Sequence, residues 1–259
     1  MEEWAPAKWA IEGDNVGLHV GDRARPVSRV LTTLDLSEMV LREAVQGRFD
    51  FVVAHHPLIS RHVPTINSIT TDDVLGKKIM TLISNGIGFF CAHTNLDMAE
   101  GGVNDLLFDL LGLTNRELLS EPKMPDYPSL GAIGYLDQPM ELAVYADYIG
   151  KALGSETVRY VGEKGQMIRK VGMCCGNGTS LTQYALAKKC DLFITGDIGY
   201  HLAMMAIENN MALIDATHYA TEIPIARAIA NYLKNAADQH GFDLTVQETR
   251  VNGQVFRST

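Results

Sequence analysis

Apolar stretches alternate with amphipathic stretches along this chain, and the alternation predicts repeated strand–helix–strand units. Residues 28–57, SRVLTTLDLSEMVLREAVQGRFDFVVAHHP, run from an apolar strand through a polar turn and an amphipathic helix to a second apolar strand. Residues 169–198, RKVGMCCGNGTSLTQYALAKKCDLFITGDI, repeat this order without a gap, with Val30 aligned to Val171 at an offset of 141. Two such units predict an α/β fold with mainly parallel sheets.

The repeat continues further along both halves. Residues 83–97, ISNGIGFFCAHTNLD, resemble residues 207–222, IENNMALIDATHYATE, at an offset of 124. Because the offset drops from 141 to 124, the first half carries 17 additional residues, in or near residues 61–78. The chain is therefore predicted to form two similar α/β lobes related by an internal repeat.

The expected lobes are residues 1–112 and residues 168–259. Residues 113–167 connect them with a proline-bearing turn region (EPKMPDYP), a short glycine-rich strand and a helix. We expect this connector to complete the lobes rather than to form a third core. Near the end of the chain, the Asn252–Gly253 pair is flanked by β-forming residues and predicts a hairpin.

Composition and charge narrow the class of protein. With 31 acidic and 22 basic residues the net charge is -9, which makes nucleic-acid binding unlikely although a local basic surface is not excluded. No apolar run approaches the roughly 18 residues of a membrane span, and the start MEEWAPAKWA lacks the pattern of a secretory signal. Four cysteines without regular spacing indicate reduced core thiols in a cytoplasmic protein; they are Cys91, Cys174, Cys175 and Cys190.

Histidines and acids gather where the predicted strands end. The run FVVAHHP ends in His55 and His56, and Pro57 stops regular strand pairing there. In open α/β sheets, ligands bind beyond the carboxyl ends of the strands. A packed core histidine explains any single one of these residues, but five of the eight histidines in the chain lie at such ends. The set predicts a metal site; the other strand-end residues are His93, Asp97, Asp197, His201, His218 and Glu222.

Imidazole and carboxylate ligands suit zinc, iron, manganese or cobalt, and the absence of thiolate ligands disfavours a structural zinc site. Three imidazoles and two carboxylates are more than one catalytic zinc usually takes, so we expect two divalent ions per chain, about 3.5–4 Å apart. His218 and Glu222 are expected on the turn that enters a helix at Pro224.

Five sequence blocks resemble those of the Nif-three-like family, also called the type 2 homologue of GTP cyclohydrolase I. The blocks are DNVGLHVG (14–21), the HHP pair, AHTNLD followed by GGVNDLL, TGDIGYH and HYATE, in family order over nearly the whole chain. The resemblance implies a two-lobed α/β fold with a dinuclear metal centre between the lobes, in a toroidal homohexamer. The family's metal ligands correspond to His55, His56, Asp97, His218 and Glu222.

The resemblance also places His93, Asp197 and His201 near the metals, where they are expected to transfer protons or support the ligands. The short connector indicates that this chain lacks the extra domain that some members carry. Two positions depart from the family pattern: Thr217 stands where glycine usually precedes the second-lobe histidine, and Gly13 stands where the family has tryptophan.

A divalent metal lowers the pKa of bound water to about 7, which favours hydrolysis. The resemblance implies opening of the imidazole ring of GTP, with a phosphoesterase as a further alternative. The opposing hypothesis is a non-catalytic protein that binds or delivers metal, or a regulatory hexamer. The glycine turn CCGNGTS (174–180) is either a tight turn, which is the commoner case, or a cradle for a phosphate.

Overall fold

The computed structural model describes residues 1–60, 66, 68–120 and 128–257. The turn region EPKMPDYP, apart from its last residue, and most of residues 61–67 lie outside this part of the chain. The described chain forms two compact units, Met1–Leu96 with Ile225–Gly253, and Asp97–Pro224 with Gln254–Thr259. The expected lobes divide the chain at other positions, because its last helix and last strand pack on the first sheet.

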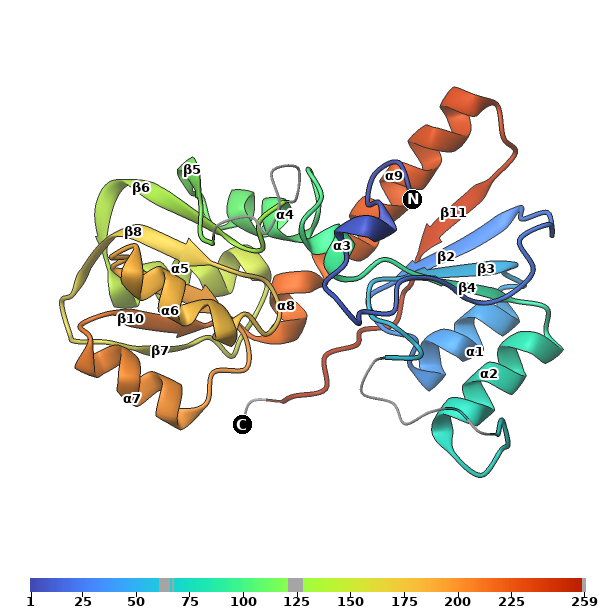
Figure 1. Ribbon diagram of the computed structural model, residues 1–259, viewed down its shortest axis with the longest axis horizontal. Coiled ribbons are helices and arrows are strands. Elements are labelled where there is room, and N and C mark those ends of the chain that lie inside the picture. The colour runs from blue at the N-terminus through green and yellow to red at the C-terminus, as the bar shows by residue number, and fades with distance from the viewer. Residues whose placement is uncertain (61–65, 67, 121–127, 258–259) are drawn as a thin grey trace. The chain divides into compact units, whose positions relative to one another are not determined.

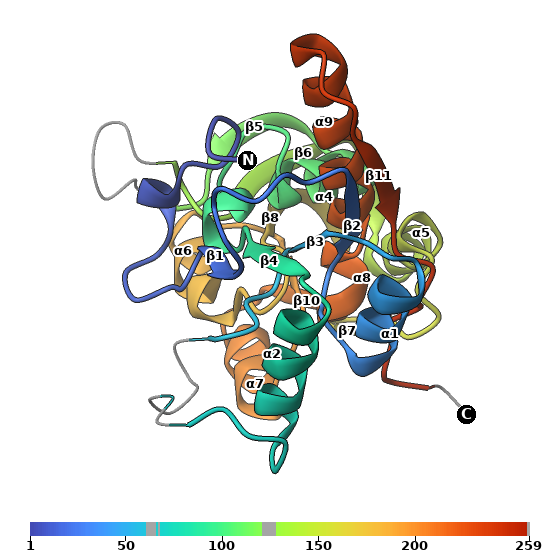
Figure 2. The ribbon, with the colours of Figure 1, turned by 90° about the vertical axis from the view of Figure 1, so that its right-hand side faces the viewer.

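The first unit is built on a five-stranded sheet. Its strands, in spatial order, are β1 (Gly17–Val20), β4 (Gly88–Cys91), β3 (Phe51–Ala54), β2 (Arg29–Thr33) and β11 (Thr245–Glu248). Strand β1 is antiparallel to β4, and the other neighbours are parallel. Helices α1 (Glu38–Gln46) and α2 (Val74–Ser84) lie on one side of the sheet and α9 (Pro224–His240) lies on the other (Figures 1 and 2).

Alternating side chains of β2 explain these two layers. Leu31 is fully buried in the core with Leu41 of α1 and Leu82 of α2. The next residue, Thr32, points to the opposite face, where its hydroxyl donates a 2.7 Å hydrogen bond to the Ala226 carbonyl of α9. The N-terminal segment, with the short helix η1 (Ala7–Trp9), also meets α9, because the Trp4 ring stacks on Tyr232 at 4.6 Å between centroids.

The second unit contains a six-stranded sheet. Its strands, in order, are β5 (Thr114–Leu118), β6 (Ala132–Glu141), β8 (Met167–Met173), β9 (Leu192–Thr195), β10 (Ala212–Asp215) and β7 (Arg159–Val161). The strands β8, β9 and β10 are parallel, whereas the flanking pairs are antiparallel. The predicted connector strand and helix are therefore confirmed as β6 and α5 (Leu142–Leu153), and both belong to this unit.

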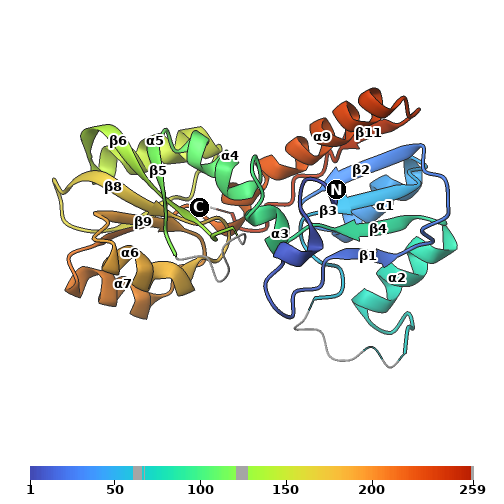
Figure 3. The same ribbon diagram turned by 45° about the horizontal axis from the view of Figure 1, so that its top comes forward.

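Helices cover both faces of the second sheet. Figure 3 shows α6 (Thr182–Ala187) and α7 (Tyr200–Glu208) on one side, and α4 (Val103–Leu110) and α5 on the other. The side with α6 and α7 encloses a core that includes Phe193, Leu213 and Ala206. The remaining helices are short: α3 (Thr94–Asp97), η2 (Thr179–Leu181) and α8 (His218–Glu222). All four cysteines are buried thiols that form no disulfide with one another, as expected of core thiols.

The strand positions reproduce the predicted repeat. Strand β3 begins at residue 51 and β9 at residue 192, which is the offset of 141; β4 begins at 88 and β10 at 212, which is the offset of 124. In each unit the three repeated strands are parallel neighbours, in the orders β2–β3–β4 and β8–β9–β10. The predicted α/β class is confirmed, with the parallel pairing concentrated in these central strands.

The predicted hairpin at Asn252–Gly253 is wrong for the part of the chain that the structure describes. Strand β11 pairs in parallel with β2 instead, in the register Val246 to Val30. The chain that follows is held by Glu43 of α1, whose carboxylate accepts hydrogen bonds from the Thr249 hydroxyl and the Arg250 amide. Parallel pairing with the buried sheet therefore replaces the local turn. No helix within the described ranges is long and apolar enough to cross a membrane.

An aspartate holds the start of the first strand in both repeats. Asp50 accepts hydrogen bonds from the backbone amides of Ser28 (2.9 Å) and Arg29 (2.8 Å). Its repeat equivalent, Asp191, accepts from the amides of Arg169 (3.0 Å) and Lys170 (2.8 Å). Burial alone would raise the pKa of Asp50, but the hydrogen bonds from Ser28 and Arg29 outweigh burial and lower this pKa.

We predict that Asp50→Ala and Asp191→Ala each lower the free energy of unfolding by about 1 kcal/mol, because two backbone amides lose a charged acceptor that is partly screened by solvent. The change is measured by urea unfolding, with Asp147→Ala on the exposed face of α5 as the control. Because the pKa of Asp50 is lowered by folding, the effect of Asp50→Ala is full above about pH 4 and shrinks as the pH falls through the folded-state pKa. An effect that is constant down to pH 2 would contradict this role.

Candidate metal centre

Three histidines of the first unit form what we call the imidazole cluster: His55, His56 and His93. One ring nitrogen from each lies within 4.8 Å of those of the other two. His55 and His56 directly follow β3, and their backbone amides donate to the carbonyls of Thr33 and Leu34 beside the end of β2. Pairing with β2 thus fixes both residues where the strand ends, and both rings contribute to one cluster.

Oxygen acceptors hold the Nδ1 atom of each ring. The Nδ1 of His55 lies 2.8 Å from the Ala92 carbonyl oxygen. Since a carbonyl only accepts hydrogen bonds, neutral His55 carries its proton on Nδ1 and keeps the lone pair on Nε2. Carboxylates hold the other two rings in the same way: His56 Nδ1 lies 2.8 Å from Asp35 Oδ1, and His93 Nδ1 lies 2.9 Å from Asp14 Oδ2.

This arrangement is the one that histidine ligands of metals usually show, with one nitrogen on the metal and the other N–H donated to a carbonyl or carboxylate. The donor set therefore fits a divalent transition metal. Neither Asp35 nor a role for Asp14 was predicted from the sequence. Asp35 follows β2 in the stretch TTLDLS, so the strand-end criterion that selected the other residues would also have found it.

Asp14 is held by several hydrogen bonds. Burial opposes its ionisation, but hydrogen bonds from His93 and Thr94 outweigh burial and lower the pKa of Asp14 to about 2. The Thr94 hydroxyl donates to Asp14 Oδ2 at 2.5 Å and the Thr94 amide at 3.2 Å. An ionised Asp14 orients the His93 ring.

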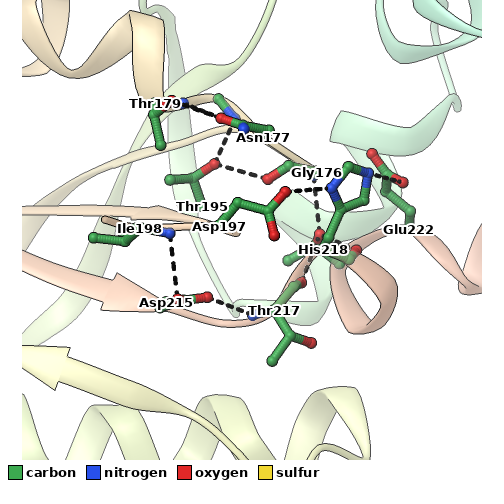
Figure 4. Close-up of polar contacts among 12 residues, drawn as sticks. Gly176, Asn177, Thr179, Thr195, Asp197, Ile198, Asp215, Thr217, His218 and Glu222 are labelled. Carbon is green, nitrogen blue, oxygen red and sulfur yellow. Dashed lines mark hydrogen bonds and ion pairs between the residues drawn. The ribbon is translucent and has the colours of Figure 1, made fainter. Parts of the chain in front are cut away.

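The second unit contributes a different set, which we call the carboxylate cluster: Asp97, His218 and Glu222. His218 and Glu222 occupy the first and last positions of α8, one turn apart, and His218 Nε2 lies 3.1 Å from Glu222 Oε2 (Figure 4). The other ring nitrogen, Nδ1, lies 2.7 Å from Asp197 Oδ2 (Figure 4). The expected helical turn before Pro224 is thus confirmed, and Asp197 orients the ring of His218.

Asp97 ends α3, at the border of the two units, and is buried. Its backbone carbonyl accepts a 2.9 Å hydrogen bond from Asn104, and its Oδ1 lies 3.3 Å from the Cys175 sulfur. A hydrogen bond with Cys174, burial, and the nearby carboxylates of Asp97 and Glu222 raise the pKa of the Cys175 thiol well above its usual value. The neutral thiol is therefore a hydrogen-bond donor to Asp97, a contact that the sequence analysis did not anticipate.

Gly176 keeps space open beside the ligands of this cluster. A Cβ atom at this position would overlap Glu222 Oε1 and lie 3.2 Å from His218 Nε2. Gly176 also has a left-handed φ of 54°, which suits glycine. Its amide donates to the Thr221 hydroxyl, and its carbonyl accepts from the Gly196 amide. The same carbonyl accepts from the Thr195 hydroxyl (Figure 4).

The glycine turn at residues 174–180 is a tight turn rather than a phosphate cradle. Its amides donate to other groups of the same unit: Cys175 to Asn104, Gly176 to Thr221, Gly178 to Thr195 and Thr179 to Asn177. A phosphate site at a turn needs several amides directed at the ligand. Of the two alternatives that the sequence left open, these hydrogen bonds favour the tight turn.

The remaining candidate, His201, lies in the first turn of α7 and is exposed. Its ring contacts Tyr200 at 5.5 Å between centroids. Within the part of the chain that the structure covers, His201 belongs to no group of residues close enough to share a metal. Its role in proton transfer remains a prediction.

Thr217, which replaces the family glycine, keeps a backbone conformation that glycine prefers. Its φ is 66° and its ψ is 145°, a region that is unfavourable for a β-branched residue and costs about 1–3 kcal/mol. The Thr217 hydroxyl accepts from the Ala220 amide (3.3 Å) and so caps α8, while the Thr217 amide donates to Asp215 (3.1 Å). The Asp215 bond and the cap hold the strained turn that carries His218.

We predict that Thr217→Gly raises the free energy of unfolding by about 1 kcal/mol, because relief of the strained backbone exceeds the loss of the cap and the added flexibility of glycine. Urea unfolding measures the change. Thr245→Gly, at an exposed position of β11, is the control and should be destabilising. Destabilisation by Thr217→Gly would show that the cap outweighs the strain.

These observations define a class of protein: an α/β protein whose strand ends carry two groups of side chains of the kind that bind metal ions. The chain belongs to the Duf34/NIF3 (NGG1p interacting factor 3) family, whose sequence pattern it matches over residues 1–254. This confirms the resemblance read from the sequence blocks.

Individual relatives cover nearly the whole chain. A GTP cyclohydrolase 1 type 2 homolog from Clostridium acetobutylicum is 32% identical over 253 residues, which are 97% of this chain and 93% of that protein. A protein of the same name from Streptomyces coelicolor is 35% identical over 250 residues, 95% of this chain and 87% of that protein. The crystal structure of a Bacillus cereus protein related to NIF3 superposes with a TM-score of 0.91 at 25% identity, covering 100% of this chain and 96% of the other.

Proposed function

We propose that this protein is a metal-dependent hydrolase that binds two divalent ions per chain and opens the imidazole ring of a purine nucleotide such as GTP. The proposed metal ligands are His55, His56, Asp97, His218 and Glu222. The observation that carries the proposal is the set of imidazole rings whose Nδ1 atoms are each held by an oxygen acceptor, at 2.7–2.9 Å for His55, His56, His93 and His218. Such rings are prepared to bind metal through Nε2.

Divalent ions at these ligands would supply Lewis acidity and a water of lowered pKa. The residues around them have separate tasks. Asp35 and Asp197 hold the rings of His56 and His218 in one orientation. His93, whose ring the ionised Asp14 holds in one orientation, is the proposed proton carrier, since imidazole is the side chain that most often transfers protons in enzymes.

The substrate class comes from the relatives. Those from Clostridium acetobutylicum and Streptomyces coelicolor carry the name GTP cyclohydrolase 1 type 2 homolog. In the proposed reaction, water adds to the carbon between the two imidazole nitrogens of guanine, the ring opens, and a second water releases that carbon as formate. We also propose that the chain assembles as a toroidal homohexamer.

A non-catalytic role in binding or delivering metal is the second candidate. The observation in its favour is the glycine turn at residues 174–180, whose amides are used within the second unit and do not offer a cradle for a triphosphate. Under this alternative, the same ligands release metal to an acceptor protein instead of activating water.

We predict that the purified protein binds two divalent ions per chain and releases formate from GTP, and that both properties fall sharply in His55→Ala and in Glu222→Gln. Each variant removes one proposed ligand without enlarging a side chain. Metal is measured by elemental analysis after dialysis against zinc, manganese or iron(II), and formate by NMR. His240→Ala, at the exposed end of α9, is the matched control and should keep both properties.

The combination of results separates the candidates. Metal binding that depends on the ligands, without turnover of GTP but with transfer to an apo acceptor, supports delivery. Ligand-dependent cleavage of a small phosphoester panel, without formate, identifies a phosphoesterase. Equal metal content in the wild type and both ligand variants would contradict the metal centre itself.

We further predict that Cys175→Ala weakens metal binding about tenfold, because loss of the thiol leaves the Asp97 carboxylate without one of its orienting donors. Cys175→Ser retains a donor and should keep most of the affinity. Competition with a chromogenic chelator measures the dissociation constants. Cys190→Ala is the control, since this buried cysteine packs in the core with Phe193; an equal loss in this variant would show that the effect comes from general loosening.

A further inference from the structure

The first unit contains a cavity that is separate from the imidazole cluster. Its volume is about 480 Å³, within the range of small-molecule sites in proteins. The walls are mainly aliphatic side chains from β1, α2 and the segments beside them: Val20, Ile59, Ile69, Ile79, Ile83 and Ile87. We call it the isoleucine pocket.

The isoleucine pocket lies at the amino ends of the central strands. Phe51 and Gly88, which begin β3 and β4, line it, whereas the imidazole cluster follows the carboxyl ends of the same strands. Four strand residues at about 3.3 Å each separate these two ends by about 13 Å. The pocket is therefore a site of its own and not an extension of the candidate metal centre.

Among the described residues that line the pocket, Arg25 is the only cation. Its charge helps to lower the pKa of Asp50 at the same pocket, but no hydrogen bond joins its guanidinium to the described part of the chain. Arg25 is exposed, so it lies where the pocket opens to solvent. Its head group rests on Gly86, where any Cβ would overlap Nη1. Because Gly86 has no side chain, the guanidinium lies directly against its backbone, beside the apolar walls of the pocket.

The other polar groups of the pocket are already used. Asp50 accepts from the Ser28 and Arg29 amides, and Asp22 Oδ1 accepts a 2.9 Å hydrogen bond from the Ala24 amide. His19 is held at both nitrogens, with Nε2 3.0 Å from the Asn15 carbonyl and Nδ1 accepting from the Ile59 amide. The guanidinium feels the charge of Asp50, but its N–H donors are the polar groups of the pocket that remain to bind a ligand.

We propose that the isoleucine pocket binds a small amphiphilic carboxylate, with the apolar chain against the isoleucines and the carboxylate on Arg25. An aliphatic body matches aliphatic walls, and a planar carboxylate matches the two-pronged donor geometry of arginine. A single negative charge is favoured over a phosphate dianion, because Asp22 and Asp50 lie at the same pocket and the chain carries a net charge of -9.

The test measures the binding of sodium octanoate to the full-length protein by isothermal titration calorimetry and by ligand-observed NMR. We expect octanoate to bind more tightly than octanol or octyl phosphate, and acetate to bind negligibly. Arg25→Ala should weaken octanoate about fivefold and leave octanol unchanged, as expected for one partly exposed charge pair. Arg23→Ala, an exposed arginine two residues away that does not line the pocket, is the matched control and should not change binding.

A second variant keeps the test informative if Arg25 contributes little. Ile83→Glu places a negative charge on an exposed residue of α2 that lines the pocket, so it should abolish octanoate binding while the fold is kept. Equal affinity for octanol and octanoate, or octanoate binding that neither variant changes, would overturn the proposal. Absence of octanoate binding would also overturn the proposal. If Ile83→Glu then changed the oligomeric state in sedimentation velocity, the pocket would be a protein–protein surface instead.

Discussion

Hydrogen bonds that the Nδ1 atoms of four imidazole rings donate to oxygen acceptors are the constraint on which the candidate site depends. A histidine that rotates freely, or that carries its proton on the wrong nitrogen, is a poor ligand. In this chain a carbonyl oxygen holds His55, and carboxylates hold His56, His93 and His218. Each acceptor comes from the end of another strand or from a neighbouring loop, so the fold sets the chemical state of the rings before any ligand binds.

The repeated βαβ architecture explains why such acceptors are available. The carboxyl ends of parallel strands lie along one edge of a sheet, where side chains from successive strands converge. In the first unit, Asp35 follows β2 and His55 follows β3; in the second, Asp197 follows β9 and His218 follows β10. Each unit thus uses the carboxyl-terminal edge of its own sheet, but the chemistry differs: imidazole nitrogens in the first unit and mostly carboxylate oxygens in the second.

Much of this organisation could be predicted from the sequence, because it depends on local patterns. The offsets of 141 and 124 between halves place the central strands correctly, and polar residues after apolar runs identify the ligand candidates. The partner of β11 could not be predicted in this way. An Asn-Gly pair is a local hairpin signal, whereas pairing with β2 joins residues more than 200 positions apart, and no sequence pattern encodes such a contact.

The residues that orient the proposed metal ligands could not be predicted from the sequence either. Cys175 follows strand β8 in an apolar context and has the sequence signature of a core thiol, yet its sulfur lies 3.3 Å from the Asp97 carboxylate. Asp14 precedes the first strand by only a few residues, and its role appears only when Thr94 and His93 are folded against it. Orienting groups of this kind depend on tertiary packing, so composition and spacing reveal the ligands more readily than their supports.

Charge burial gives an independent reason to expect cations at the carboxylate cluster. Asp97 is 8% exposed and Glu222 is 4% exposed, and burying an ionised carboxylate without compensation is strongly unfavourable. Cys175 offers Asp97 a neutral thiol donor, and His218 lies beside Glu222 with its other nitrogen already held by Asp197. Carboxylates and imidazoles gathered in this way are ligands that divalent transition-metal ions bind, and the charge of such an ion would offset the cost of burying the two acids.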